Sequence, residues 1–266
     1  MTQIHQTAVV HKNSEIGENV VIGPYAVIDE QTQIADGVKI GPHVVVHKHV
    51  SLGGNCVVHA HAVLGDLPQD LVYQDVVSYV RVGAGTTIRE GVTIHRGTKA
   101  ETTTAVGENC YLMANSHLAH NVRLGDNVVL ANGALLAGYV EVGERAFISG
   151  NCVIHQFVRI GRLAMLGGNS GLSQDVPPFC TAASVHLNAL AGINVVGLRR
   201  AGISAPDRLI IKRVFAVLFR SGLNVSQAVE KIRREEQSPY AREICDFIAA
   251  SKRGVCAARI SGENGE

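Results

Sequence analysis

A six-residue repeat of large aliphatic residues governs most of this chain. When the sequence is divided into hexads from Ile4, the first position of every repeating hexad is Val, Ile or Leu. The fifth position is small or β-branched, from Ala8 onward to Ser170 and Val176, and glycine often fills the second position. The first positions are Ile4, Val10, Ile16, Ile22, Ile28, Ile34, Ile40, Val46, Leu52, Val58, Leu64, Val82, Ile88, Ile94, Val106, Leu112, Leu118, Leu124, Leu130, Leu136, Val142, Ile148, Ile154, Ile160, Leu166 and Leu172.

A period of six fits neither a helix, whose apolar stripe recurs about every 3.6 residues, nor a long strand, whose side chains alternate. It fits short strands separated by corners, so that three hexads form one triangular coil of about 18 residues. The aliphatic side chain fills the interior, the small residue fits where the walls converge, and glycine tolerates the corner dihedrals. Stacked at the sheet spacing of about 4.8 Å, such coils form a parallel β-helix in which residues about 18 positions apart lie above one another.

Two segments, 66–81 and 100–105, interrupt the repeat but leave its phase unchanged. Loops that leave a rigid solenoid without disturbing it tend to carry binding function. The hexads stop after residues 175–179 and helical spacing follows, with Ser204 and Ser238 near prolines as expected helix starts and Gly222 and Gly254 as expected stops. We therefore expect a β-helix domain over 1–186 and a helical domain over 187–266 that caps one open end of the solenoid.

Composition narrows the function classes. Aromatic residues make up only 5% of the chain, tryptophan is absent and there are 28 glycines, which suits a narrow core. A net charge of +1 argues against a nucleic-acid binder. Neither a membrane-spanning run nor a signal peptide is evident, so we expect a cytoplasmic protein. The six cysteines form no C-x-x-C pair, and we expect them to be reduced core residues.

Four histidines, His95, His117, His120 and His155, lie along one edge of the predicted stack and are candidates for catalysis. Seven others occupy early turns and His186 follows the repeats, and we interpret these as solvated residues. One coil after His120 the same column contains Gly138 and Tyr139, and two coils after it contains His155 and Gln156. If 100–105 loops out, His95 and Arg96 lie one coil before His120, and His117 lies beside it.

The residues themselves leave two chemistries open at this column. The ordinary pKa of histidine, about 6.5, suits proton abstraction at neutral pH. Histidine clusters also bind zinc with an open coordination position, which would suit metal-assisted hydration. The sequence has neither a G-x-S-x-G motif nor a cysteine next to this column, so a covalent nucleophile is not indicated.

Longer motifs add a family resemblance that covers essentially the whole chain. The chain resembles the UDP-N-acetylglucosamine O-acyltransferases that begin lipid A synthesis. The resemblance implies a left-handed β-helix, an exception to the usual right-handed crossover, and a homotrimer with active sites between subunits. The motifs are GVTIHRGT at 91–98, MANSHLAHNVRLGDNVVLANGALLAG at 113–138, VIHQFVRIG at 153–161, GLSQDVPPF at 171–179 and GINVVGLRRAGIS at 192–204.

The resemblance also implies roles for individual residues. His120 matches the general base that deprotonates the glucosamine 3-hydroxyl, which attacks the thioester of a 3-hydroxyacyl–acyl carrier protein. The Gly138 N–H matches the oxyanion donor. No cofactor is implied, since phosphopantetheine arrives on the carrier protein. The substrate-contacting positions are His95, His117 and His155 for the sugar and phosphates, Gln156 for phosphopantetheine, Asn194 and Arg200 for nucleotide and carrier protein, Gly168 for the acyl chain, and Gln69 and Asp70 in the first loop.

Three positions depart from the family pattern. Val72 replaces a usual lysine, Tyr139 replaces a usual histidine and Val196 replaces a usual glutamate. Tyr139 is still expected to contact the substrate, because tyrosine can hydrogen-bond, but tyrosine is no base near neutral pH. These departures keep an alternative open, an amide-forming transferase on a 3-amino sugar nucleotide or another nucleotide sugar. A zinc hydratase on the same solenoid and a non-catalytic scaffold are further alternatives.

Overall fold

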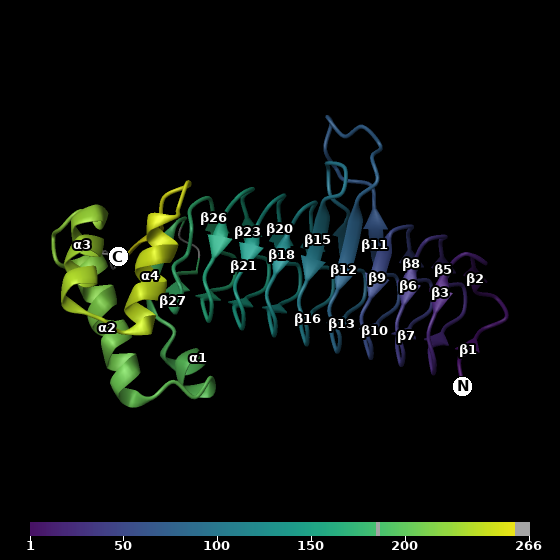
Figure 1. Ribbon diagram of the computed structural model, residues 1–266, viewed down its shortest axis with the longest axis horizontal. Helices are drawn as coiled ribbons and strands as arrows, with labels where there is room; N and C mark the ends of the chain where they lie inside the picture. Colours follow the sequence, from purple (N-terminus) through teal and green to yellow (C-terminus); the bar gives the residue numbers. More distant parts are fainter. Residues whose placement is uncertain (185–186, 259–266) are drawn as a thin grey trace, which may run out of the picture.

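The computed structural model describes residues 1–184 and 187–258, so the expectation for His186 lies outside the described residues. The chain winds into a column of stacked triangular coils, with helices at the end opposite the N-terminus (Figure 1). The coils contribute strands to three parallel sheets, called A, B and C in the order in which the chain visits them. No helix among the described residues is long and apolar enough to cross a membrane.

Each sheet receives one short strand from each coil. Sheet A contains β1 (Gln3–Ile4), β4 (Val21–Ile22), β7 (Lys39–Ile40), β10 (Val57–Val58), β13 (Thr87–Ile88), β16 (Tyr111–Leu112), β19 (Val129–Leu130), β22 (Phe147–Ile148), β25 (Met165–Leu166), β27 (Cys180–Ala182), β28 (Ala189–Ile193) and β29 (Ala257–Ala258). Sheet B contains β2 (Val9–Val10), β5 (Val27–Ile28), β8 (Val45–Val46), β11 (Val63–Asp66), β14 (Thr93–His95), β17 (His117–Leu118), β20 (Leu135–Leu136), β23 (Val153–Ile154) and β26 (Gly171–Leu172). Sheet C contains β3 (Glu15–Ile16), β6 (Gln33–Ile34), β9 (Val50–Leu52), β12 (Tyr79–Val82), β15 (Thr103–Val106), β18 (Arg123–Leu124), β21 (Glu141–Val142) and β24 (Arg159–Ile160).

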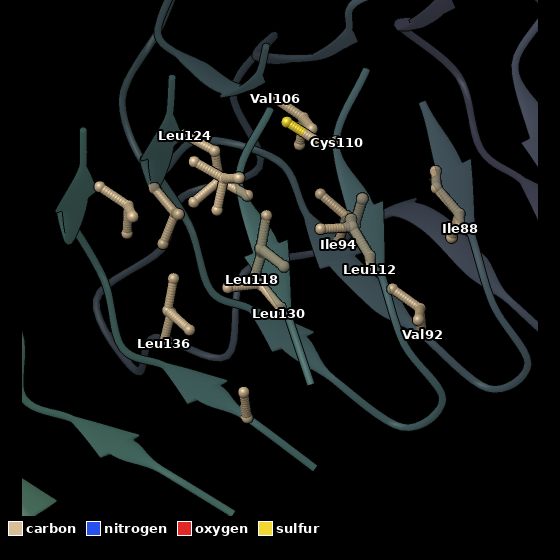
Figure 2. Close-up of a cluster of buried hydrophobic side chains, with 14 of the residues drawn as sticks. Ile88, Val92, Ile94, Val106, Cys110, Leu112, Leu118, Leu124, Leu130 and Leu136 are labelled. Atoms are coloured by element: carbon tan, nitrogen blue, oxygen red, sulfur yellow. The ribbon is translucent and has the colours of Figure 1, made fainter. Parts of the chain in front are cut away.

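The register confirms the stacking that the hexads predict. Leu118 pairs with Leu136 and Leu136 pairs with Ile154, each one coil further along the chain. In most two-residue strands the second residue is buried and the first faces outward. The buried aliphatic side chains stack along the axis of the column, as Leu112, Leu118, Leu130 and others do in Figure 2. All six cysteines are buried free thiols.

The first loop is shorter than the repeat predicts, and the second lies earlier in the chain. Asp66 ends β11 and residues 79–81 belong to β12, so the first loop spans 67–78. Residues 103–105, expected in the second loop, belong to β15, and the chain leaves the coil at 96–102 instead. The reason is that β12 and β15 pair over four residues, with Val80 and Thr104 buried in the interior. The hexad phase counts the extra residues but does not show where they leave the coil.

The C-terminal segment is mainly helical and covers one end of the column. Its helices are α1 (Val195–Arg200), α2 (Ala205–Arg220), α3 (Val225–Glu235) and α4 (Pro239–Ala249). Ser204 and Ser238 cap α2 and α4 as expected. β28 and β29, which the sequence did not predict, continue sheet A beyond the last coil. Leu190, Phe215 and Cys256 join the buried core of the β-helix, so this segment closes the open end.

Candidate functional site

The predicted column of polar residues lies on the corner where the chain passes from sheet B to sheet C, here called the B–C corner. His95 ends β14, His120 follows β17, and Gly138 follows β20. Both loops leave the coils at this corner, after β11 and β14, and the longer one projects from the column in Figure 1. The β-helix therefore supplies a rigid row of side chains, and the loops cover it.

His120 is buried within this row. The exposed fraction of the residue is 7%. Its Nδ1 lies 3.1 Å from Oδ1 of Asn121, and its Nε2 lies 3.9 Å from a carboxylate oxygen of Asp70 in the first loop. The 3.9 Å separation is longer than a hydrogen bond. Nε2 is thus directed toward the loop without being bonded to it.

A cavity of about 500 Å³ lies between the first loop and sheet B. It brings together six of the predicted site residues, three from the column, two from the loop and Gln156. Apolar side chains from the loop and the outer face of sheet B form the rest of the wall. The lining residues are Gln69, Asp70, Leu71, His117, Ala119, His120, Leu135, Leu136, Ala137, Gly138, Val153, Ile154 and Gln156.

Gly138 lies directly against the His120 imidazole. A Cβ atom added to Gly138 would lie 2.3–2.9 Å from three atoms of the ring, closer than real Cβ contacts. Among the described residues, the Gly138 N–H has no hydrogen-bond acceptor, whereas its carbonyl accepts from the N–H of Phe157. Glycine is therefore required for the imidazole to occupy this position, and a free backbone donor lies beside it.

His117 and His95 pack against each other close to His120. Their ring centroids are 4.9 Å apart in an edge-on arrangement, and Nδ1 of His117 lies 2.7 Å from the Thr93 hydroxyl. Burial lowers the pKa of His117 to about 4, with the neighbouring His95 adding to the effect. Burial also lowers the pKa of His95, against the opposing charge of Asp66. Both rings are consequently neutral at physiological pH and can serve as hydrogen-bond donors or acceptors.

The lowered pKa of His117 predicts a loss of stability in acid. Between about pH 6.5 and pH 4 the unfolded chain binds a proton at His117 that the folded protein excludes. Stability from this residue is therefore present above pH 6.5 and lost as the pH falls toward 4. We expect His117→Gln to reduce the fall in the melting temperature between pH 7.5 and pH 5. A change as large in His11→Gln, where the side chain is exposed, would contradict this assignment.

Tyr139 lies on the other side of His120 and outside this cavity. Its ring is edge-on to His120 at 5.2 Å between centroids and stacked on Phe157 at 5.0 Å. Its hydroxyl lies 3.0 Å from Oγ1 of Thr98 in the second loop. The side chain of Tyr139, predicted to contact the substrate, lines a groove beside sheet C with Arg123 and Arg159.

Four predicted residues do not converge on the His120 cavity within one chain. His155 is exposed, with Nδ1 3.2 Å from the Gln156 carbonyl. Gly168 lies on the corner between sheets A and B, with room for a methyl group. Asn194 and Arg200 line a separate cavity of about 820 Å³ on the outer face of sheet A. Asn194 also caps α1, because Oδ1 accepts from the Gly197 N–H and Nδ2 donates to the Leu163 carbonyl.

The other two departures from the family pattern are exposed. Val72, in the first loop, is 79% exposed and its N–H donates to Asp70 at 3.1 Å. Val196 lines the cavity on sheet A beside Asn194. Within 1–184 and 187–258, no group of three or more His, Cys, Asp or Glu side chains is arranged to hold a metal ion.

Sequence reasoning missed Asn121, which contacts His120, and Thr98, which contacts Asn121. Asn121 Oδ1 lies 3.1 Å from both the N–H and the hydroxyl of Thr98. The only sequence signal was position, since Asn121 directly follows His120. The contact to Thr98 could not be predicted because it depends on the path of the second loop.

Comparisons with known proteins agree with this architecture. A model of hexapeptide repeats of bacterial transferases matches residues 31–66 and 103–138, and a model of the second domain of UDP-N-acetylglucosamine O-acyltransferases matches 175–256. The acyl-[acyl-carrier-protein]–UDP-N-acetylglucosamine O-acyltransferase of Chlorobaculum parvum is 54% identical over 96% of this chain and 97% of its own length. That of Sulfurihydrogenibium is 48% identical over 96% of this chain and 94% of its own length.

Solved structures agree in the same way. The UDP-N-acetylglucosamine acyltransferase of Bacteroides fragilis superposes with a TM-score of 0.93 at 37% identity, covering 95% of this chain and 99% of that one. The Campylobacter jejuni enzyme gives 0.91 at 36% identity, covering 97% of this chain and all of that one. These likenesses confirm the expected fold class, a left-handed parallel β-helix followed by helices. The chain belongs to the acyl-[acyl-carrier-protein]–UDP-N-acetylglucosamine O-acyltransferase family.

Proposed function

We propose that this protein transfers a 3-hydroxyacyl chain from acyl carrier protein to the glucosamine 3-hydroxyl of UDP-N-acetylglucosamine, the first step of lipid A synthesis. The observation that carries the proposal is the arrangement at the B–C corner. A buried imidazole and a free backbone N–H face one cavity of about 500 Å³. The substrates are those stated in the names of the family members, acyl-[acyl-carrier-protein] and UDP-N-acetylglucosamine.

The reaction follows from these two groups without a covalent enzyme intermediate. His120 removes the proton from the sugar 3-hydroxyl as the oxygen attacks the thioester carbonyl. Asp70, 3.9 Å from Nε2, favours the positive charge that develops on the imidazole. The Gly138 N–H donates to the oxyanion of the tetrahedral intermediate, a contact of about 3 kcal/mol in comparable sites. Collapse breaks the C–S bond, and the carrier thiolate leaves with the proton from His120.

The outer faces of the three sheets support assembly into a trimer. Side chains on sheets A and B are largely apolar, whereas those on sheet C are mostly polar or charged. Packing sheet A of one subunit against sheet B of the next would bury both apolar faces, and such a head-to-tail contact closes into a ring. The apolar side chains include Val21, Val129 and Phe147 on sheet A and Val9, Leu135 and Val153 on sheet B, against Glu15, Gln33, Arg81, Arg123, Glu141 and Arg159 on sheet C.

In such a trimer the two cavities combine into one cleft. The His120 cavity lies on sheet B and the cavity with Asn194 and Arg200 lies on sheet A. The latter pair would contact the nucleotide and the carrier protein, with Arg suited to phosphate. Gln156, in the His120 cavity, would contact the phosphopantetheine arm, so the protein needs no cofactor of its own. His155 and Gly168 would contact sugar phosphates and the acyl chain from the same cleft.

An acyl-transfer assay tests the function directly. Purified protein is incubated with UDP-N-acetylglucosamine and 3-hydroxyacyl–acyl carrier proteins of several lengths, and the products are identified by mass spectrometry. We expect the product to be an ester at the sugar 3-position. Light scattering should give a particle mass of about 85 kDa, three times that of the 28.3 kDa chain. Transfer to the 3-amino analogue with none to the hydroxyl sugar would overturn the proposal. A monomeric active enzyme would overturn the shared cleft alone.

A further inference from the structure

Asn121 has a fixed amide orientation, and this determines the protonation of His120. The Thr98 backbone N–H lies 3.1 Å from the atom assigned as Asn121 Oδ1. A backbone N–H can only donate, so the atom that receives it must be the carbonyl oxygen rather than the amide nitrogen. His120 Nδ1 lies 3.1 Å from the same oxygen, which has no proton to give. Nδ1 must therefore carry the proton.

The direction of the remaining hydrogen bonds follows from the same reasoning. Thr98 Oγ1 also donates to Asn121 Oδ1, at 3.1 Å, which uses its single proton. The Tyr139 hydroxyl, 3.0 Å from Thr98 Oγ1, must then be the donor in that pair. The result is a directed chain of hydrogen bonds from Tyr139 to Thr98 to Asn121. Asn121 Oδ1 accepts a further hydrogen bond from Nδ1 of His120. Hydrogen-bond chains of this kind order their members more than isolated pairs do.

We propose that Tyr139, Thr98 and Asn121 are positioning residues that hold His120 in the tautomer with the proton on Nδ1. This leaves the lone pair of Nε2 directed at the cavity, where a sugar hydroxyl would give up its proton. Tyr139 then acts through Thr98 and makes no contact with the sugar. The inference rests on the proposed function and specifies how its base is prepared.

The charged group nearest to His120 is Asp70, and the residue proposed to position the ring, Asn121, is neutral. Asp70 faces Nε2 from the first loop at 3.9 Å, and His95 lies behind on the neighbouring coil. Asn121 adds no charge, so Asp70 supplies the carboxylate nearest to the imidazole among the described residues. A second carboxylate at position 121 would stabilise the protonated imidazole, and that change is measurable in a pH profile.

Four variants of the hydroxyl chain test the role of Tyr139. We expect Tyr139→Phe to lower kcat about threefold and Thr98→Val about fivefold, with KM for the UDP-sugar unchanged, because each removes one hydrogen bond that acts on the base. Because Tyr139 acts through Thr98, the double variant should lose no more than Thr98→Val alone. Thr98→Ser, which keeps the hydroxyl, should restore wild-type kcat. A raised KM in Tyr139→Phe, or losses that multiply in the double variant, would overturn the proposal.

Two variants of Asn121 separate positioning from folding. Asn121→Ala frees the imidazole and should lower kcat about 30-fold at every pH, less than the factor of about 10²–10⁴ that a general base contributes, because the base itself is still present. Asn121→Asp keeps an acceptor for the same three donors and should retain kcat within about threefold at high pH. Its acidic inflection in kcat/KM should move up by about one pH unit. An Asn121→Asp profile identical to wild type would contradict the proposed contact.

A measurement independent of turnover distinguishes this inference from the proposed function. Nitrogen-15 NMR of the histidine-labelled protein separates protonated from unprotonated ring nitrogens, and His120→Gln identifies the His120 signals. We expect a protonated Nδ1 and an unprotonated Nε2 in the wild type at pH 8, and a mixture of tautomers in Asn121→Ala. A proton on Nε2 in the wild type would overturn the inference. Lack of acyl transfer with this spectrum intact would overturn only the proposed function.

Discussion

His120→Ala is expected to lower kcat for acyl transfer by about 10³-fold while the protein remains folded and keeps its oligomeric state. The sugar hydroxyl is a poor nucleophile until its proton is removed, and a general base contributes about 10²–10⁴ to the rate. Among the described residues the other imidazole that lines the cavity is His117, whose pKa is lowered to about 4, so that it is a weak base. The measurement is the initial rate with UDP-N-acetylglucosamine and a 3-hydroxyacyl–acyl carrier protein.

The control for this variant is His11→Ala. His11 lies on the same B–C corner, in the first coil, and is exposed and remote from the cavity. Its loss should leave kcat and KM at wild-type values. Light scattering and circular dichroism would establish that both variants assemble alike. Wild-type turnover in His120→Ala would exclude His120 as the base.

Gly138→Ala should have an effect of similar size through geometry alone. The new methyl carbon would lie 2.3 Å from Cε1 and 2.5 Å from Nε2 of His120, so the imidazole must move. Because His120 is buried, the ring can move only by displacing Asp70 or by breaking its hydrogen bond to Asn121. A shift of about 1 Å in a catalytic group can cost about 10²-fold in rate, and displacement of the oxyanion donor adds to it. We therefore expect kcat to fall by more than about 10²-fold.

A matched glycine shows whether this loss is specific. At Gly54 an added Cβ would have its nearest neighbour at 3.4 Å, an ordinary contact. Gly54 lies on the corner between sheets C and A, remote from the cavity. Gly54→Ala should keep wild-type kcat and melting temperature. Gly138→Ala should unfold at nearly the same temperature as the wild type, since only the site is disturbed. Full activity in Gly138→Ala would mean that the imidazole does not lie against this residue during catalysis.

The repeat made much of the site predictable before any coordinates. His120 and Gly138 could be placed together because a β-helix converts sequence separation directly into position. The same arithmetic placed His95 one coil before His120, across the second loop, and the structure packs its ring against that of His117. Sequence reasoning could not predict the Thr98–Asn121 contact, because loop conformation has no such period. It also could not show that Asn194 lines a separate cavity on sheet A, because the hexad repeat ends before this residue.

The strands on either side of the two loops resume in register, so each loop is independent of the scaffold. Leu64 pairs with Ile94 and Ile94 with Leu118, although the intervening segments differ in length. Mutation can therefore lengthen, shorten or exchange these segments without moving the imidazole row on the scaffold. A change in either loop would then alter what surrounds the histidines, including Asp70 and the Thr98 contact to Asn121, while the histidines on the coils keep their places.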